Sequence, residues 1–295
     1  MRLPTLFVAL LLACDPSPPG AAPDSAPPPA EDAAADPGTS IVAAPFLDRY
    51  DFEERLRRFE LPGRLDEVSG LAFTADGRLF AHDDERGRVH QIDPLTGDVT
   101  KAFDLGADLL RDDLEGIAVV GERFFLVSST GTLYEFREGA DGEDVTYRRT
   151  HSGVAPGCEV EGLDWDPGRD ELLIACKVFA AEAGSIVVYR LPVSPDRERP
   201  PPLRVPKSDL APFGLEADFD PSGVAVTPDG SWLLLSARHD ALIEVDPRGS
   251  ILAAVRLREG RHPQPEGLAI GPDGLLWVAD ERNGDEPRLT AYGPR

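Results

Sequence analysis

The chain has 295 residues, of which 41% are hydrophobic, and it carries 53 acidic side chains against 30 lysines and arginines. The formal net charge of −23 at pH 7 repels nucleic acids and anionic surfaces, so we expect no nucleic-acid partner. The 28 glycines and 29 prolines predict many turns, as is typical of all-β folds, and the length suits one large domain or two small ones.

The first 13 residues have the pattern of a bacterial signal peptide. Arg2 precedes an apolar run that is shorter than the roughly 20 residues needed to cross a bilayer. The run ends in Leu11-Leu12-Ala13-Cys14, which resembles the lipobox of bacterial lipoproteins, where the cysteine becomes the lipidated first residue. We therefore predict a signal peptide over residues 1–13 and lipidation of Cys14. The alternative is an ordinary secretory signal followed by an unrelated cysteine.

Residues 14–45 are dominated by alanine, proline, aspartate and serine, and they show no apolar period. Such a composition cannot bury enough surface to offset the entropy of ordering, so we predict a disordered tether. The expectation is a chain that contacts the membrane only through its lipid, with residues 46–295 folded outside the cytoplasm, in the cell envelope. We expect this domain to be a monomer.

From residue 64 onward a short phrase recurs five times around a glycine. "EVSGLAF", "DLEGIAV", "EVEGLDW", "DPSGVAV" and "QPEGLAI" centre on Gly70, Gly116, Gly162, Gly223 and Gly267. The spacings are 46, 46, 61 and 44 residues. A period of roughly 40 to 50 residues with short strands is typical of a β-propeller blade of four antiparallel strands.

Each repeat divides into strands in the same order. The phrase forms the first strand, and a tight turn such as Asp-Gly leads to an apolar second strand and an alternating third strand. Fourth strands are expected over residues 99–105, 145–150, 202–206 and 251–257. The fifth repeat ends without one, and residues 53–63 resemble the missing strand. We therefore predict an all-β, five-bladed propeller closed by an N-terminal strand. A sixth blade could lie only within residues 190–219.

The first strands line the channel, so the residue before each repeated glycine lies at the channel mouth. These residues are Ser69, Glu115, Glu161, Ser222 and Glu266. Because neighbouring strands are antiparallel, the ends of the second strands reach the same face. They bring further candidate ligand contacts, namely Asp84, Lys177, Arg238, His239, Asp280 and Glu281.

Three glutamates in one narrow mouth repel one another unless they are protonated, solvated or neutralised by a cation. Oxygen ligands without cysteine or histidine favour a hard ion such as Ca²⁺. We predict a calcium site at Glu115, Glu161 and Glu266. The alternative is a wet channel in which the acids are simply solvated.

The repeats "EVSGLAFTADGRLFAHDDERGRV", "DDLEGIAVVGERFFLVSSTGTLYEF" and "PEGLAIGPDGLLWVADE" resemble the SdiA-regulated family of bacterial propellers across nearly all of residues 50–295. The resemblance implies a five-bladed propeller with a calcium site and no established activity. It also implies a distant similarity to NHL-repeat and gluconolactonase-type propellers, which place a metal-binding glutamate before a glycine. Ser69 and Ser222 depart from this glutamate pattern.

Cys158 and Cys176 flank the first two strands of the third repeat and lie at the same face, so we predict a disulfide. Two buried free thiols are the alternative. His82 and His239 are candidates for a general base or for a substrate contact, but solvated loop histidines explain them equally.

Two functional hypotheses follow. The first is a lipid-anchored, calcium-binding propeller that binds a partner or small molecule of unknown identity. The second is a metal-dependent hydrolase of an ester, lactone or phosphate ester, in which Lys177, Arg238 or Arg282 holds an anionic group. The sequence contains no nucleophile elbow, zincin motif or phosphate loop.

Overall fold

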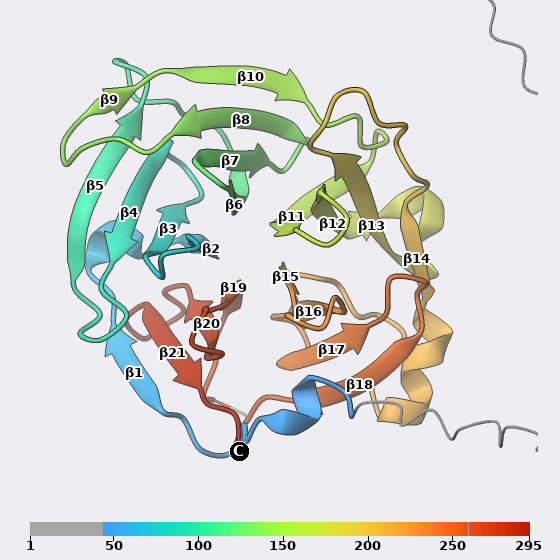
Figure 1. Ribbon diagram of the computed structural model, residues 1–295. Coiled ribbons are helices and arrows are strands. Elements are labelled where there is room, and N and C mark those ends of the chain that lie inside the picture. Colours follow the sequence, from blue (N-terminus) through green and yellow to red (C-terminus); the bar gives the residue numbers. More distant parts are fainter. Residues whose placement is uncertain (1–43, 259) are drawn as a thin grey trace, which may run out of the picture. The chain divides into compact units, whose positions relative to one another are not determined.

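The computed structural model describes residues 44–258 and 260–295, which form a closed ring of five β-sheets (Figure 1). The predicted signal peptide, Cys14 and nearly all of the predicted tether lie outside the described residues. The five-bladed propeller prediction is confirmed, and residues 190–219 contain no extra blade. Among the described residues, no helix has the length and hydropathy needed to span a membrane.

Four blades each take four strands from one repeat, in chain order from the axis outward (Figure 1). The first blade contains β2 (Val68–Phe73), β3 (Leu79–Asp83), β4 (Arg88–Ile92) and β5 (Val99–Leu105). The second contains β6 (Leu114–Val120), β7 (Arg123–Ser128), β8 (Thr132–Arg137) and β10 (Tyr147–His151). The third contains β11 (Cys158–Asp166), β12 (Glu171–Phe179), β13 (Ser185–Pro192) and β14 (Leu203–Pro206). The fourth contains β15 (Gly223–Val226), β16 (Trp232–Ser236), β17 (Ala241–Val245) and β18 (Ile251–Arg256).

The fifth blade is shared between the two ends of the described chain. It consists of β19 (Pro265–Ile270), β20 (Leu276–Asp280), β21 (Arg288–Tyr292) and, outermost, β1 (Arg57–Glu60). Strand β1 pairs antiparallel with β21, with Arg57 opposite Ala291 and Glu60 opposite Arg288. The predicted closure by an N-terminal strand is therefore confirmed, and it covers the edge that the fifth repeat leaves open.

One local pairing was not expected from the sequence. Residues 144–145 form β9 (Asp144–Val145), which pairs parallel with β5 and adds a fifth strand to the first blade. The fourth strand of the second blade, predicted from residue 145, therefore begins at Tyr147. The bond from Asp104 N to Glu143 O, at 2.9 Å, contributes to this link between the first two blades.

The hydrophobic core lies between neighbouring blades. Five clusters of buried side chains alternate with the five blades around the ring, and the second strands supply many of their members. The cluster between the fourth and fifth blades also contains Phe46, Leu47, Tyr50 and Phe52 from the segment before β1. The N-terminal segment thus contributes to the core as well as to the sheet.

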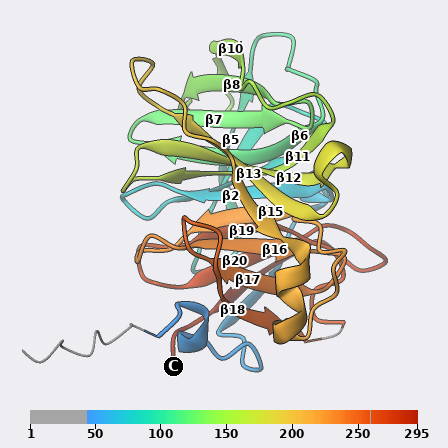
Figure 2. The same cartoon turned by 90° about the vertical axis from the view of Figure 1, so that its right-hand side faces the viewer.

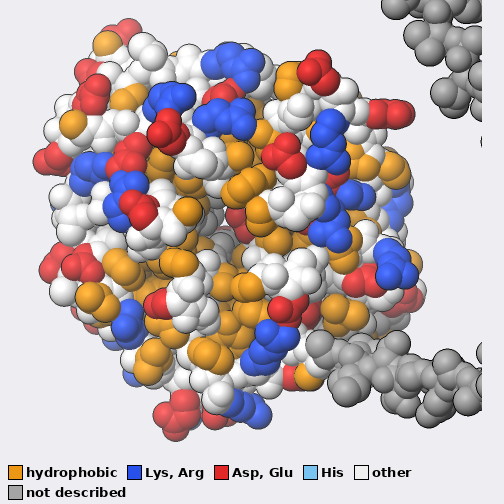
Figure 3. Space-filling model, viewed as in Figure 1, with side chains coloured by type: hydrophobic (Ala, Val, Ile, Leu, Met, Phe, Trp, Pro, Cys, Tyr) orange, Lys and Arg blue, Asp and Glu red, His pale blue; other side chains and the backbone are white. Residues whose placement is uncertain are grey.

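The two faces of the ring differ. The inner strands all begin at one face, which we call the mouth face, and four short 3-10 helices lie in connections: η1 (Leu47–Arg49), η2 (Gly63–Leu65), η3 (Ala180–Glu182) and η4 (Lys207–Phe213). Helices η3 and η4 directly follow β12 and β14, which end at the mouth face, and the side view places both helices on the side away from the viewer of Figure 1 (Figure 2). Figure 3 therefore shows the face opposite the mouth, where hydrophobic side chains gather around the centre and charged ones lie mainly toward the rim.

Candidate functional site

The repeated glycines allow the five inner strands to approach closely at the axis. A Cβ atom on Gly116 would lie 2.6 Å from the Leu163 backbone nitrogen, and one on Gly223 would lie 2.7 Å from the Glu266 carbonyl oxygen. Both distances are shorter than any side chain tolerates. The space at the axis between these strands, which is also lined by Ser69, Glu115 and Glu266, has a volume of only about 10 Å³. The inner strands thus leave little room at the axis beside these residues.

Glu115 lies at the start of the second blade's inner strand and contacts the first blade. Ser69 Oγ donates a hydrogen bond to Glu115 Oε2 at 3.0 Å. Burial, followed by the negative charges of Glu161 and Asp113, raises the pKa of Glu115 to about 9. The Ser69 hydrogen bond and the charge of Lys177 oppose this shift but do not cancel it. At neutral pH the free site therefore favours a protonated Glu115.

Glu161, on the third blade, is only 6% exposed and pairs with a lysine on the neighbouring strand β12. Lys177 Nζ donates to Glu161 Oε1 at 2.9 Å. Burial raises the pKa of Glu161, and the charge of Lys177 offsets only part of that rise. Burial works to lower the pKa of Lys177, but the charges of Glu161, Glu266 and Glu159 raise it overall, which keeps the lysine charged.

Glu266, on the fifth blade, has an unsatisfied carboxylate oxygen. Its side chain is buried, and Oε2 has no hydrogen-bond partner among the described residues. Burial, with the charges of Glu161 and Glu281, raises the pKa of Glu266 to about 8. A buried carboxylate oxygen without a partner is energetically unfavourable, so this atom needs a proton or a cation.

Two further acids extend this group toward the first blade. Burial, followed by the charges of Asp84 and Glu161, raises the pKa of Glu281 to about 7. Gln264 Nε2 donates to Glu281 Oε2 at 2.7 Å. Burial, followed by the charge of Glu67, also raises the pKa of Asp84, whose Oδ1 is buried without a partner in the described part of the chain.

Together these acids form what we call the mouth cluster, defined by Asp84, Glu115, Glu161, Glu266 and Glu281 with Lys177. The five carboxyl groups come from four blades, and the charge of Lys177 acts on four of them, all except Asp84. The donor set is oxygen-rich and suits a hard cation such as Ca²⁺. In the described residues, the carboxylate oxygens of Glu115, Glu161 and Glu266 do not all lie within 4.8 Å of one another, so a single ion at the mouth cluster would need bridging water for part of its coordination.

Other predicted contacts have local partners. Ser222 Oγ donates to Pro265 O at 2.7 Å and accepts from Ala237 N at 3.1 Å, so it ties the fourth blade to the fifth. Asp280 is fully buried, and its Oδ2 lies 2.8 Å from His262 Nδ1, whereas its Oδ1 has no hydrogen-bond partner among the described residues. The ring of His262 also contacts the Tyr292 hydroxyl, at 2.6 Å from Nε2. The side chains of Ser222 and Asp280 are therefore engaged in contacts of the blades themselves.

Arg238 and His239 lie in a separate group on the fourth blade. Arg238 pairs with Asp218 and Asp220, each at 3.2 Å. His239 Nε2 lies 2.7 Å from Asp218 Oδ1. The ligand atoms of Glu216, Asp218 and His239 all lie within 4.8 Å of one another. The sequence placed Arg238 and His239 at the channel mouth, and in the structure their carboxylate partners are Asp218 and Asp220 of the segment before β15.

His82 is fully buried beneath Gly70 rather than solvent-accessible. Its Nδ1 lies 2.9 Å from Asp83 O, and Nε2 has no partner among the described residues. Burial lowers the pKa of His82 to about 4, so the ring is neutral at physiological pH. A Cβ atom on Gly70 would lie 2.5 Å from Nε2, so His82 fills the space that this glycine leaves open.

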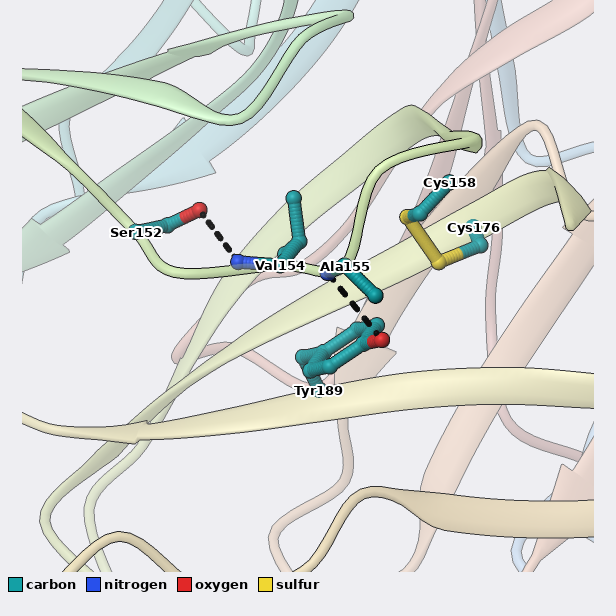
Figure 4. The surroundings of a disulfide bond; sticks show 6 residues. All are labelled: Ser152, Val154, Ala155, Cys158, Cys176 and Tyr189. Atoms are coloured by element: carbon teal, nitrogen blue, oxygen red, sulfur yellow. Dashed lines mark hydrogen bonds between the residues drawn. A yellow bond between two sulfur atoms is a disulfide. The ribbon is translucent and has the colours of Figure 1, made fainter.

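Cys158 and Cys176 form a disulfide at the mouth end of the third blade (Figure 4). Their Cα atoms are 5.4 Å apart, and the bond joins the start of β11 to β12. The adjacent loop is held by a hydrogen bond of 3.2 Å from Ala155 N to the Tyr189 hydroxyl oxygen. Because Glu161 and Lys177 lie on these same two strands, the disulfide supports the part of the third blade that enters the mouth cluster.

The geometry defines a class of protein, namely a five-bladed β-propeller with carboxyl groups gathered at one mouth of its axis. The profile of the SdiA-regulated family matches residues 46–284, and the chain belongs to that family. A comparison with curated proteins found no match to this sequence.

Several solved structures share the fold. Glutaminyl cyclase of Myxococcus xanthus has a TM-score of 0.56 at 15% identity, covering 81% of this chain and 95% of that one. The aldose sugar dehydrogenase of Streptomyces coelicolor, in its PQQ-bound form, has a TM-score of 0.53 at 15% identity, covering 82% and 98%. A luciferin-regenerating enzyme has a TM-score of 0.51 at 10% identity, covering 80% and 94%. At these identities the likeness shows the fold alone.

Proposed function

We propose that the protein is a calcium-binding propeller of the bacterial cell envelope, anchored by a lipid on Cys14, which binds a partner or small molecule at its mouth. The observation that carries the calcium proposal is the Oε2 atom of Glu266, buried without a hydrogen bond among acids whose pKa values are raised. Bound calcium would neutralise these acids and hold the inner strands of different blades together. The ion would be held by Glu115, Glu161 and Glu266, directly or through water.

Charge supports a cation more strongly than simple solvation. The mouth cluster holds one lysine against five carboxyl groups, and the space at the axis beside Glu115 and Glu266 is only about 10 Å³. This volume holds about one water molecule, too little to solvate both carboxylates from the axis. Protonation or a cation remains, and calcium competes with protons more effectively as pH rises.

The test is thermal unfolding with calcium or with EDTA. Calcium should raise the melting temperature of the parent chain, since a ligand that binds only the folded state stabilises it by mass action. The triple variant Glu115→Gln, Glu161→Gln, Glu266→Gln should lose this response and, in EDTA, should be at least as stable as the parent, because like charges have been removed. The matched control changes three exposed glutamates, Glu122, Glu143 and Glu198, to glutamine.

If the parent does not respond to calcium, or if the triple variant responds as fully as the control, the acids bind no ion. The anchor proposal is tested separately by mass spectrometry of protein from its native host. Residues 1–13 should be absent and a lipid should be attached to Cys14. A mature chain that begins at another residue would exclude the anchor.

The hydrolase hypothesis rests on Lys177. Its side chain is 38% exposed, so a bound anionic group could contact the ammonium beside the proposed ion. Calcium-dependent turnover of ester, lactone or phosphate-ester substrates that is lost in Lys177→Met would support this hypothesis. Absence of turnover from a calcium-loaded protein would leave binding as the function of the mouth.

A further inference from the structure

A second charged site lies where the ring closes. A cavity of about 700 Å³ is lined by Glu53, Glu54, Arg55, Arg58, Arg258, Gly260, Arg261 and Arg288. These residues come from the segment leading into β1, from the connection between β18 and β19, and from the start of β21. The volume is within the range of small-molecule sites in proteins. We call it the seam cavity.

The charge of the seam cavity is opposite to that of the whole chain. Five of its eight lining residues are arginines, although acids outnumber bases 53 to 30 in the sequence. Such a concentration of guanidinium groups is not expected from the composition of an acidic protein. It therefore indicates a role for positive charge at this place in the structure.

Among the described residues, which exclude Glu259 between Arg258 and Gly260, carboxylates neutralise only part of this positive charge. Arg58 lies 3.6 Å from Glu60, and Arg288 pairs with Asp285. Within residues 44–258 and 260–295, Arg55 and Arg258 form no ion pair, and neither do Glu53 and Glu54. The two lining glutamates thus do not pair with the arginines of the cavity.

Arg261 is held in place by the backbone. It donates to the carbonyl oxygens of Phe52 at 2.9 Å and Glu53 at 3.1 Å. These bonds orient the guanidinium and fix the N-terminal segment against the fifth blade, but they add no negative charge. A positioned, uncompensated guanidinium is a typical component of an oxyanion site.

Arg288 supplies an independent sign of a missing partner. It is 8% exposed, and its Nε is buried without a hydrogen-bond partner among the described residues. Its Nη1 donates at 3.5 Å to Arg261 O, which joins the two arginines at the cavity wall. A guanidinium stays charged in proteins, so burial with an unsatisfied donor is unfavourable unless another group compensates.

We propose that the seam cavity binds a phosphate group, carried either by a soluble small molecule or by a lipid headgroup. Phosphate offers several oxygens to planar guanidinium forks, which can bind it through paired hydrogen bonds. Because the lining comes from three separate segments, a bound phosphate bridges the N-terminal segment to the fifth blade. This site is independent of the mouth cluster and does not rest on the calcium proposal.

The first experiment measures the melting temperature of the full chain in EDTA with inorganic phosphate, using sodium chloride at equal ionic strength as the reference. Phosphate several-fold above its dissociation constant should raise the melting temperature by roughly 2 to 4 °C. The variant Arg55→Gln, Arg258→Gln should lose this rise, and both side chains are exposed, so folding is expected. The control Arg111→Gln, Arg149→Gln removes the same charge from exposed positions elsewhere and should retain it.

A second experiment distinguishes the two sources of phosphate. The full chain carrying Cys14→Ser, which prevents lipidation, is sedimented with vesicles of phosphatidylglycerol or of phosphatidylcholine. Retention on phosphatidylglycerol that is lost with Arg55→Gln, Arg258→Gln assigns a lipid headgroup. A phosphate-dependent melting rise without vesicle binding assigns a soluble ligand. The proposal is overturned if phosphate has no effect beyond chloride, or if the cavity variant and the control respond alike.

Discussion

The mouth and the seam concentrate opposite charges by different routes. At the mouth, repetition places an acid at the same position of three blades, and Glu266 Oε2 is left without a partner. At the seam, distant segments meet as the ring closes, and Arg288 Nε is left without a partner. Repetition can be seen in one sequence, whereas closure joins residues more than 200 positions apart. Charged sites in this ring thus arise in two ways, from the sequence repeat and from the contact between distant segments that closes the ring.

The largest expected effect comes from removing the N-terminal segment that closes the ring. Deleting residues 46–62 removes β1 and strips Phe46, Leu47, Tyr50 and Phe52 from the core between the fourth and fifth blades. The open edge of β21 should then cause aggregation or a large loss of stability. Soluble yield and thermal melting of the deletion variant measure this effect.

A single substitution tests the same contact without shortening the chain. Phe52→Ala should cost about 3 to 5 kcal/mol because it creates a cavity beside Tyr292. Leu95→Ala, at a residue 69% exposed, should have little effect and serves as the control. If deletion of residues 46–62 left the melting temperature unchanged, closure of the ring by β1 would be rejected.

Breaking the disulfide should weaken the mouth and spare the seam. Replacing Cys158 and Cys176 with serine opens a loop with a sequence separation of 18 residues, which should cost about 3 kcal/mol in urea unfolding. Calcium affinity should fall, because Glu161 and Lys177 lie on the two strands that the bond joins, while the phosphate response should be unchanged. Equal loss of both responses would show that the two sites are not independent.

The sequence predicts the fold better than the site. The glycine period determines the blades because Gly116 and Gly223 lie where no side chain fits, and the missing fourth strand requires closure by the N-terminal segment. The same period places Glu115, Glu161 and Glu266 at one mouth.

Loop geometry is not encoded in that period. Asp280 turns into the fifth blade toward His262, and Arg238 turns outward to Asp218. Gln264 joins the mouth cluster by bonding Glu281, and its place two residues before Glu266 was the only available signal. The arginines of the seam lie on three segments whose meeting depends on the closed ring, so no local pattern indicated them.

A smaller effect is the pH dependence of stability that the mouth acids cause. In EDTA, the raised pKa values of Glu115, about 9, and Glu266, about 8, contribute stability that is complete below their unfolded pKa near 4.5. This contribution is lost as pH rises through about 8 to 9, so the parent should lose more melting temperature between pH 6.5 and 9 than Glu115→Gln, Glu266→Gln. Burial lowers the pKa values of His82 and His90 to about 4, which opposes this trend near pH 6.5, but both proteins contain these histidines, so their contribution cancels in the comparison. Identical pH profiles for the two proteins would show that these glutamates are not electrostatically strained.

Calorimetric titration of calcium into metal-free protein at pH 8 measures whether the mouth cluster binds the ion. We expect one ion per parent chain, and we expect Glu266→Gln to bind at least about tenfold more weakly, because calcium affinity follows the charge and number of its oxygen ligands. The exposed control Glu198→Gln should titrate as the parent does. Absence of binding by the parent, or equal affinity in Glu266→Gln, would contradict a calcium site at the mouth of this propeller.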